Sequence, residues 1–158
     1  MRSRKDMQDA FVRRYGGIYE HSPWVAEGSF VTGVPDLSVK MREVVENAGV
    51  ERQLTLLRAH PDLAGKLATS GELTDESTSE QASAGLDQCT DAEFAAFTAL
   101  NDAYKTKFGF PYILAVKGRH RTEILENFRS RIDNSYDQEF REALDQVHQI
   151  AKLRLANL

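Results

Sequence analysis

Two groups of residues in this chain have the types and spacing needed for acid–base chemistry. His60 ends a helical pattern directly before Pro61, and a proline disfavours helical backbone in the residue that precedes it. The imidazole is therefore expected at a helix end beside a loop, where it could transfer a proton. Ser77, Glu80 and Gln81 place a hydroxyl, a carboxylate and an amide close together, a combination suited to binding a polar heterocycle.

Both groups also have a purely structural interpretation. A histidine at a helix C-terminus is stabilised by the helix dipole and can donate a hydrogen bond to an unpaired carbonyl. Ser77 and Glu80 fit a Ser-x-x-Glu capping box, in which Glu80 only reaches back to the backbone N–H of Ser77. Spacing alone leaves these alternatives open.

The remaining histidines and the cysteine give weaker signals. His120 lies in a compact basic turn, Lys117–Arg121, which is either a solvated loop or an anion-binding patch. His21 and His148 are expected at the surface or hydrogen-bonded to a partner. No His-x-x-x-His or paired His/carboxylate spacing occurs, so a metal site is not expected. Cys89 is interpreted as a small packing residue.

Composition excludes several classes of protein. The chain has 158 residues, with 20 Lys and Arg against 24 Asp and Glu, and its net charge of -4 argues against a nucleic-acid or anionic-membrane partner. One cysteine excludes a disulfide scaffold. There is no apolar run of roughly 18 to 20 residues that could span a membrane. Without a signal peptide or a C-terminal Ser-Lys-Leu sequence, a soluble cytoplasmic protein is expected.

Helical periodicity dominates the elements that must position these groups. Helices are predicted over 36–48, over 50–60, over 62–70, behind a Thr90–Glu93 capping box as far as Gly109, from a Thr122 cap, and behind a Ser135–Gln138 capping box to Leu155. Residues 69–84 have the composition of a flexible polar loop. Residues 112–116 could form a strand but have no partner run, so a buried extended segment is expected.

These patterns predict a single, compact, all-α domain over residues 1–158. Its one extended segment follows the Phe-Gly-Phe-Pro motif.

Several motifs occur in a fixed order along nearly the whole chain. They are Gly17–Ala26, His60-Pro61-Asp62-Leu63-Ala64-Gly65, Ser77-x-x-Glu80-Gln81, Phe108-Gly109-Phe110-Pro111-Tyr112-Ile113 and Ile150–Leu155. Together they resemble the 2-oxo-4-hydroxy-4-carboxy-5-ureidoimidazoline (OHCU) decarboxylases of urate degradation. The resemblance implies an all-α homodimer that converts OHCU to (S)-allantoin without a cofactor.

The resemblance also assigns roles to residues of this chain. His60 is implied as the catalytic acid, and Glu80 as the catalytic residue that works beside it. The implied substrate-binding residues are Pro61, Ser77, Gln81, Phe110, Tyr112, Ile113, Leu114, Ala115, Val116, Lys117 and Arg119. Some members of the family have an arginine shortly after the Phe-Pro segment. Here Lys117 lies at that place and Arg119 follows two residues later, so the partner of the substrate carboxylate stays open between them.

The chemistry of OHCU fits a chain without cofactor motifs. Its carboxylate is attached beside a C=N bond that can accept the electron pair when CO2 leaves, so neither pyridoxal phosphate nor thiamine is needed. We expect His60 to transfer a proton with the help of Glu80, and Gln81 and backbone N–H groups to orient the ring.

The sequence leaves two alternative functions open. One is another cofactor-free lyase or hydrolase of a ureido or imidazole purine catabolite. The other is a helical interaction module without enzymatic activity.

Overall fold

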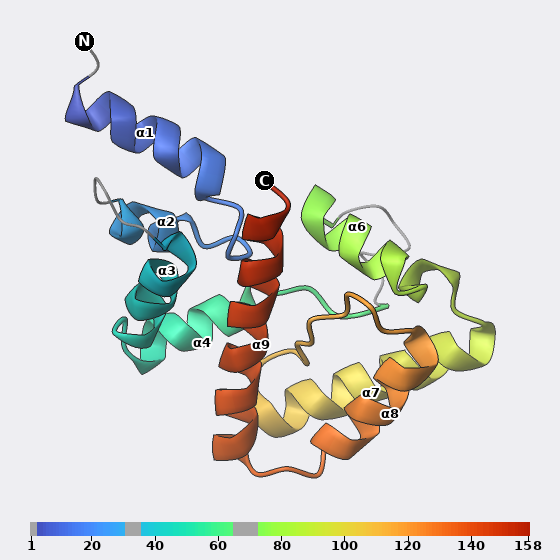
Figure 1. Cartoon of the computed structure of the whole chain (residues 1–158). Helices are drawn as coiled ribbons and strands as arrows, with labels where there is room; N and C mark the ends of the chain where they lie inside the picture. Colours follow the sequence, from blue (N-terminus) through green and yellow to red (C-terminus); the bar gives the residue numbers. More distant parts are fainter. Residues whose placement is uncertain (1–2, 31–35, 65–72) are drawn as a thin grey trace. The chain divides into compact units, whose positions relative to one another are not determined.

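The computed structural model describes residues 3–30, 36–64 and 73–158, and within these ranges the chain is helical and contains no β-strand (Figure 1). The elements in chain order are α1 (Arg4–Tyr15), α2 (Pro23–Ser29), α3 (Leu37–Glu46), α4 (Val50–Arg58), α6 (Asp75–Ser83), the 3-10 turn η1 (Leu86–Gln88), α7 (Asp91–Phe108), α8 (Arg121–Arg131) and α9 (Tyr136–Ala156). The predicted all-α class is confirmed.

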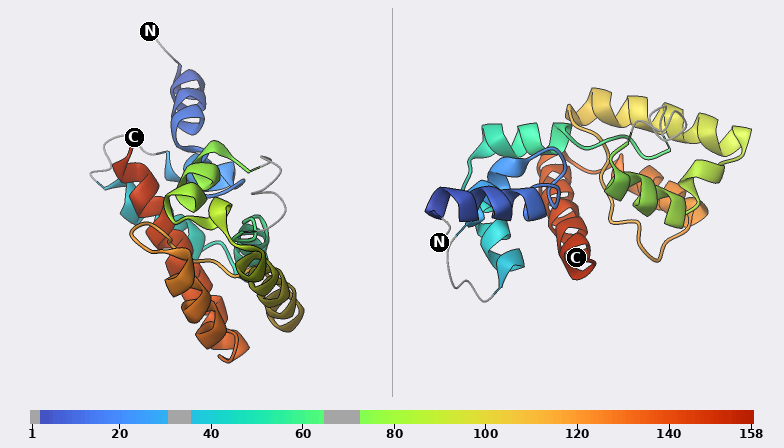
Figure 2. Two further views of the ribbon diagram at one scale, coloured as in Figure 1. Left: turned by 90° about the vertical axis from the view of Figure 1, so that its right-hand side faces the viewer. Right: turned by 90° about the horizontal axis from the view of Figure 1, so that it is seen from above.

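Internal packing divides the chain into two compact units. The first unit contains Met1–His60 and Val147–Leu158, and the second contains Pro61–Gln146. Within the first unit α2 packs against α1 and α3, and within the second α7 packs against α8 (Figures 1 and 2). Helix α9 contributes its first half to the second unit and its last turns to the first. The single-domain organisation stays a prediction.

The capping residues predicted at both ends of α7 and at the start of α9 make the expected contacts. The Thr90 hydroxyl accepts a hydrogen bond from the Glu93 N–H at 3.1 Å, and the Glu93 carboxylate accepts one from the Thr90 N–H at 2.9 Å. Gly109, with φ 77°, ends α7 in the left-handed conformation that glycine adopts without strain. Ser135 and Gln138 make the same reciprocal pair at the start of α9, at 3.2 and 2.9 Å.

Two other predicted ends were wrong by two residues. Helix α4 ends at Arg58, and the backbone already turns at His60. Helix α8 begins at Arg121 rather than behind Thr122. Its N-cap is His120, whose Nδ1 accepts from the Thr122 N–H at 3.4 Å, so an imidazole nitrogen takes the place of the expected hydroxyl.

The polar stretch that composition assigned to a loop contains a helix. Thr74 caps α6 by accepting from the Ser77 N–H at 3.2 Å, and Asp75 and Glu76 lie in the first turn, where the helix dipole favours negative charge. Ser77 and Glu80 therefore lie inside the helix, and the predicted capping box between them is wrong.

The helix predicted over 62–70 falls largely outside the described residues. Its first residues, 62–64, are described and are not helical.

The expected extended segment is present in the second unit. Residues 111–116 have no regular secondary structure, and Phe110–Val116 are all buried. Tyr112 stacks on Phe128 of α8 with ring centroids 3.8 Å apart, and Tyr104 of α7 meets Tyr112 edge-on at 5.7 Å. The aromatic side chains thus fix this segment between α7 and α8.

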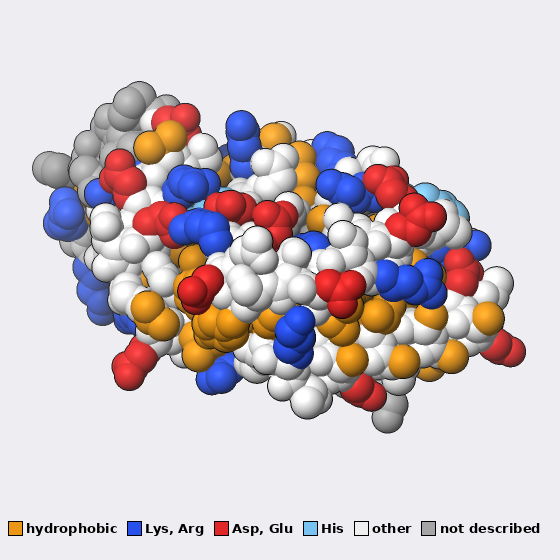
Figure 3. Space-filling view, turned by 90° about the horizontal axis from the view of Figure 1, so that it is seen from below, with side chains coloured by type: hydrophobic (Ala, Val, Ile, Leu, Met, Phe, Trp, Pro, Cys, Tyr) orange, Lys and Arg blue, Asp and Glu red, His pale blue; other side chains and the backbone are white. Residues whose placement is uncertain are grey.

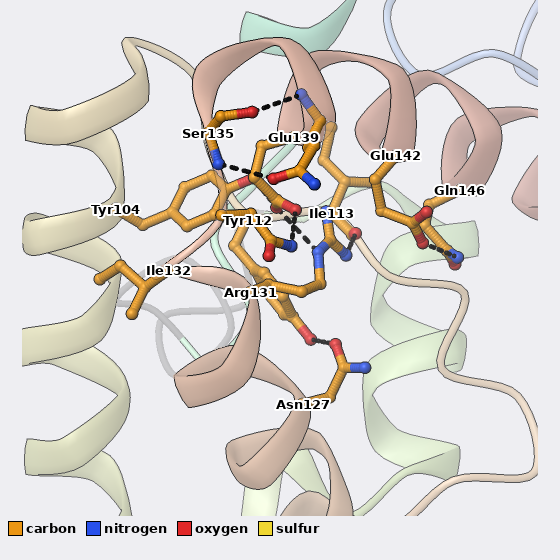
Figure 4. Close-up of polar contacts among 12 residues, drawn as sticks. Tyr104, Tyr112, Ile113, Asn127, Arg131, Ile132, Ser135, Glu139, Glu142 and Gln146 are labelled. Carbon is orange, nitrogen blue, oxygen red and sulfur yellow. Dashed lines mark hydrogen bonds and ion pairs between the residues drawn. The ribbon is translucent and has the colours of Figure 1, made fainter.

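A buried ion pair also holds the extended segment (Figure 4). Arg131 of α8 donates from Nη1 to the Ile113 carbonyl at 2.6 Å and from Nε to Glu139 of α9 at 2.8 Å. Glu139 is fully buried and also accepts from the Tyr104 hydroxyl at 2.6 Å and from Asn134 Nδ2 at 2.9 Å. Burial, followed by the bond to Glu139, raises the pKa of Tyr104 above its ordinary value, so the phenol stays a donor.

A further contact fixes the end of the segment. The Ala115 N–H donates to Gln146 Oε1 at 2.9 Å. Gln146 Nε2 donates in turn to Glu142 at 2.9 Å (Figure 4). Side chains of α8 and α9 therefore supply the backbone partners that a neighbouring strand would supply in a sheet.

Replacing Glu139 by Gln should destabilise the protein strongly, because Arg131 would keep a buried positive charge without its counterion. We expect a loss of about 3–5 kcal/mol in the free energy of unfolding, measured by urea titration. The matched control is Glu126→Gln at an exposed position of α8, for which a change within about 0.5 kcal/mol is expected. Equal urea midpoints for the two variants would contradict this assignment.

Candidate active site

His60 is buried in the first unit and is neutral at physiological pH. Its Nδ1 lies 2.9 Å from the Leu56 carbonyl oxygen, which can only accept, so Nδ1 carries the proton and Nε2 keeps the lone pair. Burial lowers the pKa of His60 to about 4, against the opposing effects of the bond to Leu56 and of the Glu20 charge. In the free protein His60 is therefore a proton acceptor through Nε2.

A second buried ion pair acts on His60 within the first unit. Arg154, near the C-terminus of α9, lies 2.8 Å from Glu20, and its Nη1 donates to the Gly17 and Ile18 carbonyls at 3.2 and 3.4 Å. Arg154 lowers and Glu20 raises the pKa of His60. The buried cation beside His60 that sequence reasoning missed is thus Arg154.

A signal for Arg154 was available in the sequence. It lies on the same helical face as Val147 and Ala151, at spacings of seven and three residues, and both of these are buried. An arginine on an apolar helical stripe is rarely buried without a partner.

Helix α6 supplies Ser77, Glu80 and Gln81 to the second unit. Ser77 and Gln81 are buried and Glu80 is partly exposed. Gln81 Oε1 accepts from the Ala64 N–H at 3.0 Å, and Gln81 Nε2 donates to the Asp62 carbonyl at 3.2 Å. Both polar atoms of Gln81 thus bind the backbone that follows Pro61. A contact between Gln81 and a substrate stays a prediction.

The pairing of His60 with Glu80 also stays a prediction. His60 belongs to the first unit and Glu80 to the second.

The extended segment presents buried backbone donors. Arg131 and Gln146 occupy the Ile113 carbonyl and the Ala115 N–H. The N–H groups of residues 113, 114 and 116 have no acceptor among the residues that the structure describes. Buried N–H groups are costly to leave unpaired, so these donors are suited to the carbonyl groups of a bound ring.

The basic turn is partly exposed, and both of its arginines are paired with carboxylates. Arg119 lies 3.4 Å from Glu123, and Arg121 lies 2.9 Å from Glu93. Lys117 has no ion-pair partner within the described ranges. Of the turn, Lys117 is the cation best able to meet an added anion.

The other expectations for single residues are met. His148 is buried, and its Nδ1 shares a hydrogen bond of 2.6 Å with the Tyr19 hydroxyl, whose pKa is raised by burial. His21 is exposed. Cys89 is half-buried, and burial raises the pKa of its thiol, as for a packing residue.

Neither a metal site nor a membrane-spanning helix is found in the described parts of the chain. Within residues 3–30, 36–64 and 73–158, no three His, Cys, Asp or Glu side chains lie close enough to hold a metal ion. No helix in these ranges is both long and apolar enough to cross a bilayer. On the face drawn in Figure 3, acidic and basic side chains are interspersed.

Comparisons with known proteins agree on one family. The sequence profile of the family described as OHCU decarboxylase matches residues 5–156. A 2-oxo-4-hydroxy-4-carboxy-5-ureidoimidazoline decarboxylase of Haloferax volcanii is 47% identical over 152 residues, which cover 94% of this chain and 88% of that relative. A uric acid degradation bifunctional protein of Bacillus subtilis is 38% identical over 90% of this chain and 29% of its own length.

A solved structure shows the same fold. The crystal structure of an (S)-allantoin synthase superposes with a TM-score of 0.75 at 33% identity. The match covers 95% of this chain and 50% of that one, so the present chain spans about half the length of this structural relative.

The buried neutral His60 should make stability depend on pH. Above about pH 6.5 the ring is neutral in both the folded and unfolded states, so its contribution is fully present. As the pH falls from about 6.5 to about 4, only the unfolded chain takes up the proton, and the free energy of unfolding falls by roughly 3 kcal/mol. Urea titrations across this range should show the loss.

The matched control for this pH dependence is His60→Asn, whose amide can still donate to the Leu56 carbonyl but does not titrate. Its free energy of unfolding should decline less over the same range, since all other groups are shared. Parallel curves for the wild type and the variant would show that His60 does not have the lowered pKa.

Proposed function

Because this chain belongs to the OHCU decarboxylase family, we propose that it decarboxylates OHCU to (S)-allantoin in urate degradation. The observation that carries the proposal is the match over residues 5–156, which includes every motif of the candidate site. The uric acid degradation and (S)-allantoin synthase relatives support the same reaction sequence.

The proposed reaction takes up one proton and moves another. When the bond to the carboxylate breaks, its electron pair forms a C=C bond in the ring, and the electrons of the adjacent C=N bond move to nitrogen, which takes up a proton as CO2 leaves. The resulting enol then loses its hydroxyl proton and gains a proton on the neighbouring carbon. This gives the ring carbonyl and the stereocentre of allantoin.

A neutral histidine suits this proton movement. In our proposal, Nε2 of His60 accepts the hydroxyl proton, and the imidazolium then returns a proton to one face of the ring. Burial disfavours the imidazolium, which supports its prompt return to the neutral form. The acid role that the resemblance implies for His60 thus arises only within the catalytic cycle. Glu80 is proposed to bind the hydroxyl or the imidazole during transfer.

The substrate carboxylate needs a cation, and the structure adds a candidate to the two from the sequence. Lys117 and Arg119 remain proposed, with Arg119 already close to Glu123. Arg154 is the buried cation that acts on His60, and its guanidinium geometry suits a carboxylate. We include it as a third candidate.

The remaining proposed substrate contacts come from the second unit. Pro61, Ser77 and the buried segment Phe110–Val116 would enclose the ring. The N–H groups of residues 113, 114 and 116, which have no acceptor among the described residues, would meet its carbonyls. A homodimer, which the family resemblance implies, and a cytoplasmic location also stay proposals.

His60→Asn and Glu80→Gln should each lose activity on freshly generated OHCU. We expect kcat to fall by about 10² to 10⁴-fold, the usual contribution of acid–base assistance. The allantoin that forms should lose its S excess as uncatalysed decay takes over, which circular dichroism can follow. Glu76→Gln, at an exposed position of the same helix as Glu80, is the control and should match the wild type. Wild-type rate and stereochemistry in both site variants would refute the assigned roles.

The pH dependence of kcat/KM separates a neutral from a charged His60 in the free enzyme. If the neutral form reacts, kcat/KM stays flat from about pH 8 to 6 and falls only as the pH approaches the His60 pKa of about 4. A charged form would instead give a rise of about tenfold for each pH unit of acidification over the same range. That rise is the outcome that excludes the base role.

A further inference from the structure

The backbone that follows Pro61 is held at both ends by one buried side chain. We refer to Asp62–Ala64 as the 62–64 segment. Gln81 of α6 donates to the Asp62 carbonyl at 3.2 Å and accepts from the Ala64 N–H at 3.0 Å. The side chain of Gln81 therefore bridges the segment in the way a neighbouring strand would. Gln81 is only 3% exposed, so water competes little for these hydrogen bonds.

A second buried amide holds the middle of the same segment. Asn101 of α7 donates from Nδ2 to the Leu63 carbonyl at 3.0 Å and is also 3% exposed. Asn101 Oδ1 has no hydrogen-bond partner among the residues described. Within the described residues, the side chain of Asn101 therefore makes one hydrogen bond, and that bond is to this segment.

The segment has a backbone conformation that its sequence does not favour. Ala64 has φ 53°, in the left-handed region that residues with a Cβ rarely adopt. Such a conformation persists where the surroundings fix it. Here the surroundings are the amides of Gln81 and Asn101, which we call the amide clamp. The ion pair between Asp62 and Lys105, at 2.7 Å, is partly exposed and adds less.

We propose that Gln81 and Asn101 are positioning residues for the proposed reaction, which fix the 62–64 segment and thereby the Pro61 backbone to which His60 is joined. This inference rests on the proposed function. It gives Gln81 a role through the backbone rather than through the substrate, and it assigns a role to Asn101, which no sequence motif singled out.

Catalysis is sensitive to small displacements of a reacting group. His60 and Pro61 are consecutive, so a relaxed 62–64 segment would shift the peptide that follows the imidazole. A displacement of about 1 Å at a reacting group can cost about 100-fold in rate. Such a shift lowers kcat, whereas the loss of a direct substrate contact that is equally strong in the ground state raises KM.

The test uses near-isosteric variants of the clamp in the full chain. Asn101→Asp replaces the donor to the Leu63 carbonyl by an acceptor, and Gln81→Glu keeps an acceptor for the Ala64 N–H but loses the donor to Asp62. We expect kcat on OHCU to fall by about 10 to 100-fold in each, with KM within about threefold of the wild type. Asn101→Ala is the milder second variant if Asn101→Asp does not fold.

Two comparisons make this test specific. Asp102→Asn, at the exposed neighbouring position of α7, should keep wild-type kcat and KM. The double variant of Gln81 and Asn101 should lose less kcat than the product of the two single losses, because both act through one segment. If the loss of kcat in the double variant equals the product of the two single losses, the two residues act separately, and the clamp is overturned.

Other outcomes also decide the question. The clamp is overturned if folded Asn101 variants keep wild-type kcat, or if Gln81→Glu raises KM alone as a direct substrate contact would. Failure of the wild type itself to turn over OHCU would instead refute the proposed function, and the catalytic role of the clamp with it. The two failures are therefore distinguished by the wild-type rate.

Discussion

The buried pair of Arg131 and Glu139 is the interaction on which the second unit depends. Removing both charges from water is costly, and the cost is offset only where each charge has several good partners. Arg131 has three partners, Glu139, the Ile113 carbonyl and the face of the Tyr112 ring, 4.7 Å away, while its buried Nη2 has no hydrogen-bond partner among the described residues. Glu139 has the Tyr104 hydroxyl as an added donor. The pair thereby joins α7, α8 and α9 to the extended segment.

These contacts solve a general problem of extended backbone in an all-α protein. A strand in a sheet finds backbone partners in its neighbour, but a lone segment must obtain them from side chains. Arg131 and Gln146 serve Phe110–Val116, and Gln81 and Asn101 serve Asp62–Ala64. Side chains that bind only some of the backbone groups leave the others unpaired. Among the described residues, the buried N–H groups of residues 113, 114 and 116 have no such partner, so they can meet a ligand.

Sequence patterns predicted what is decided locally and missed what depends on tertiary packing. The capping box of Thr90 and Glu93 spans four residues, and helical periodicity is visible within each helix by itself. Both could therefore be predicted. Ser77 failed as a cap because Thr74 competes for the same helix start. Motifs singled out His60, Glu80 and Gln81 as candidate site residues but could not show their contacts. Burial of Arg154 depends on Glu20, which lies 134 residues away in sequence, and no local pattern shows such a pairing.

Burial of His60 connects this architecture to the chemistry proposed for it. A substrate that carries its own electron sink needs no strong acid and no external acceptor for the electron pair, but it does need a group that takes up a proton and releases it. An imidazole with a pKa lowered to about 4 is neutral between turnovers and holds an acquired proton weakly. Its bond to the Leu56 carbonyl keeps Nδ1 protonated, so acceptance and return both occur at Nε2. One nitrogen in a fixed position can then deliver the proton to a single face of the ring.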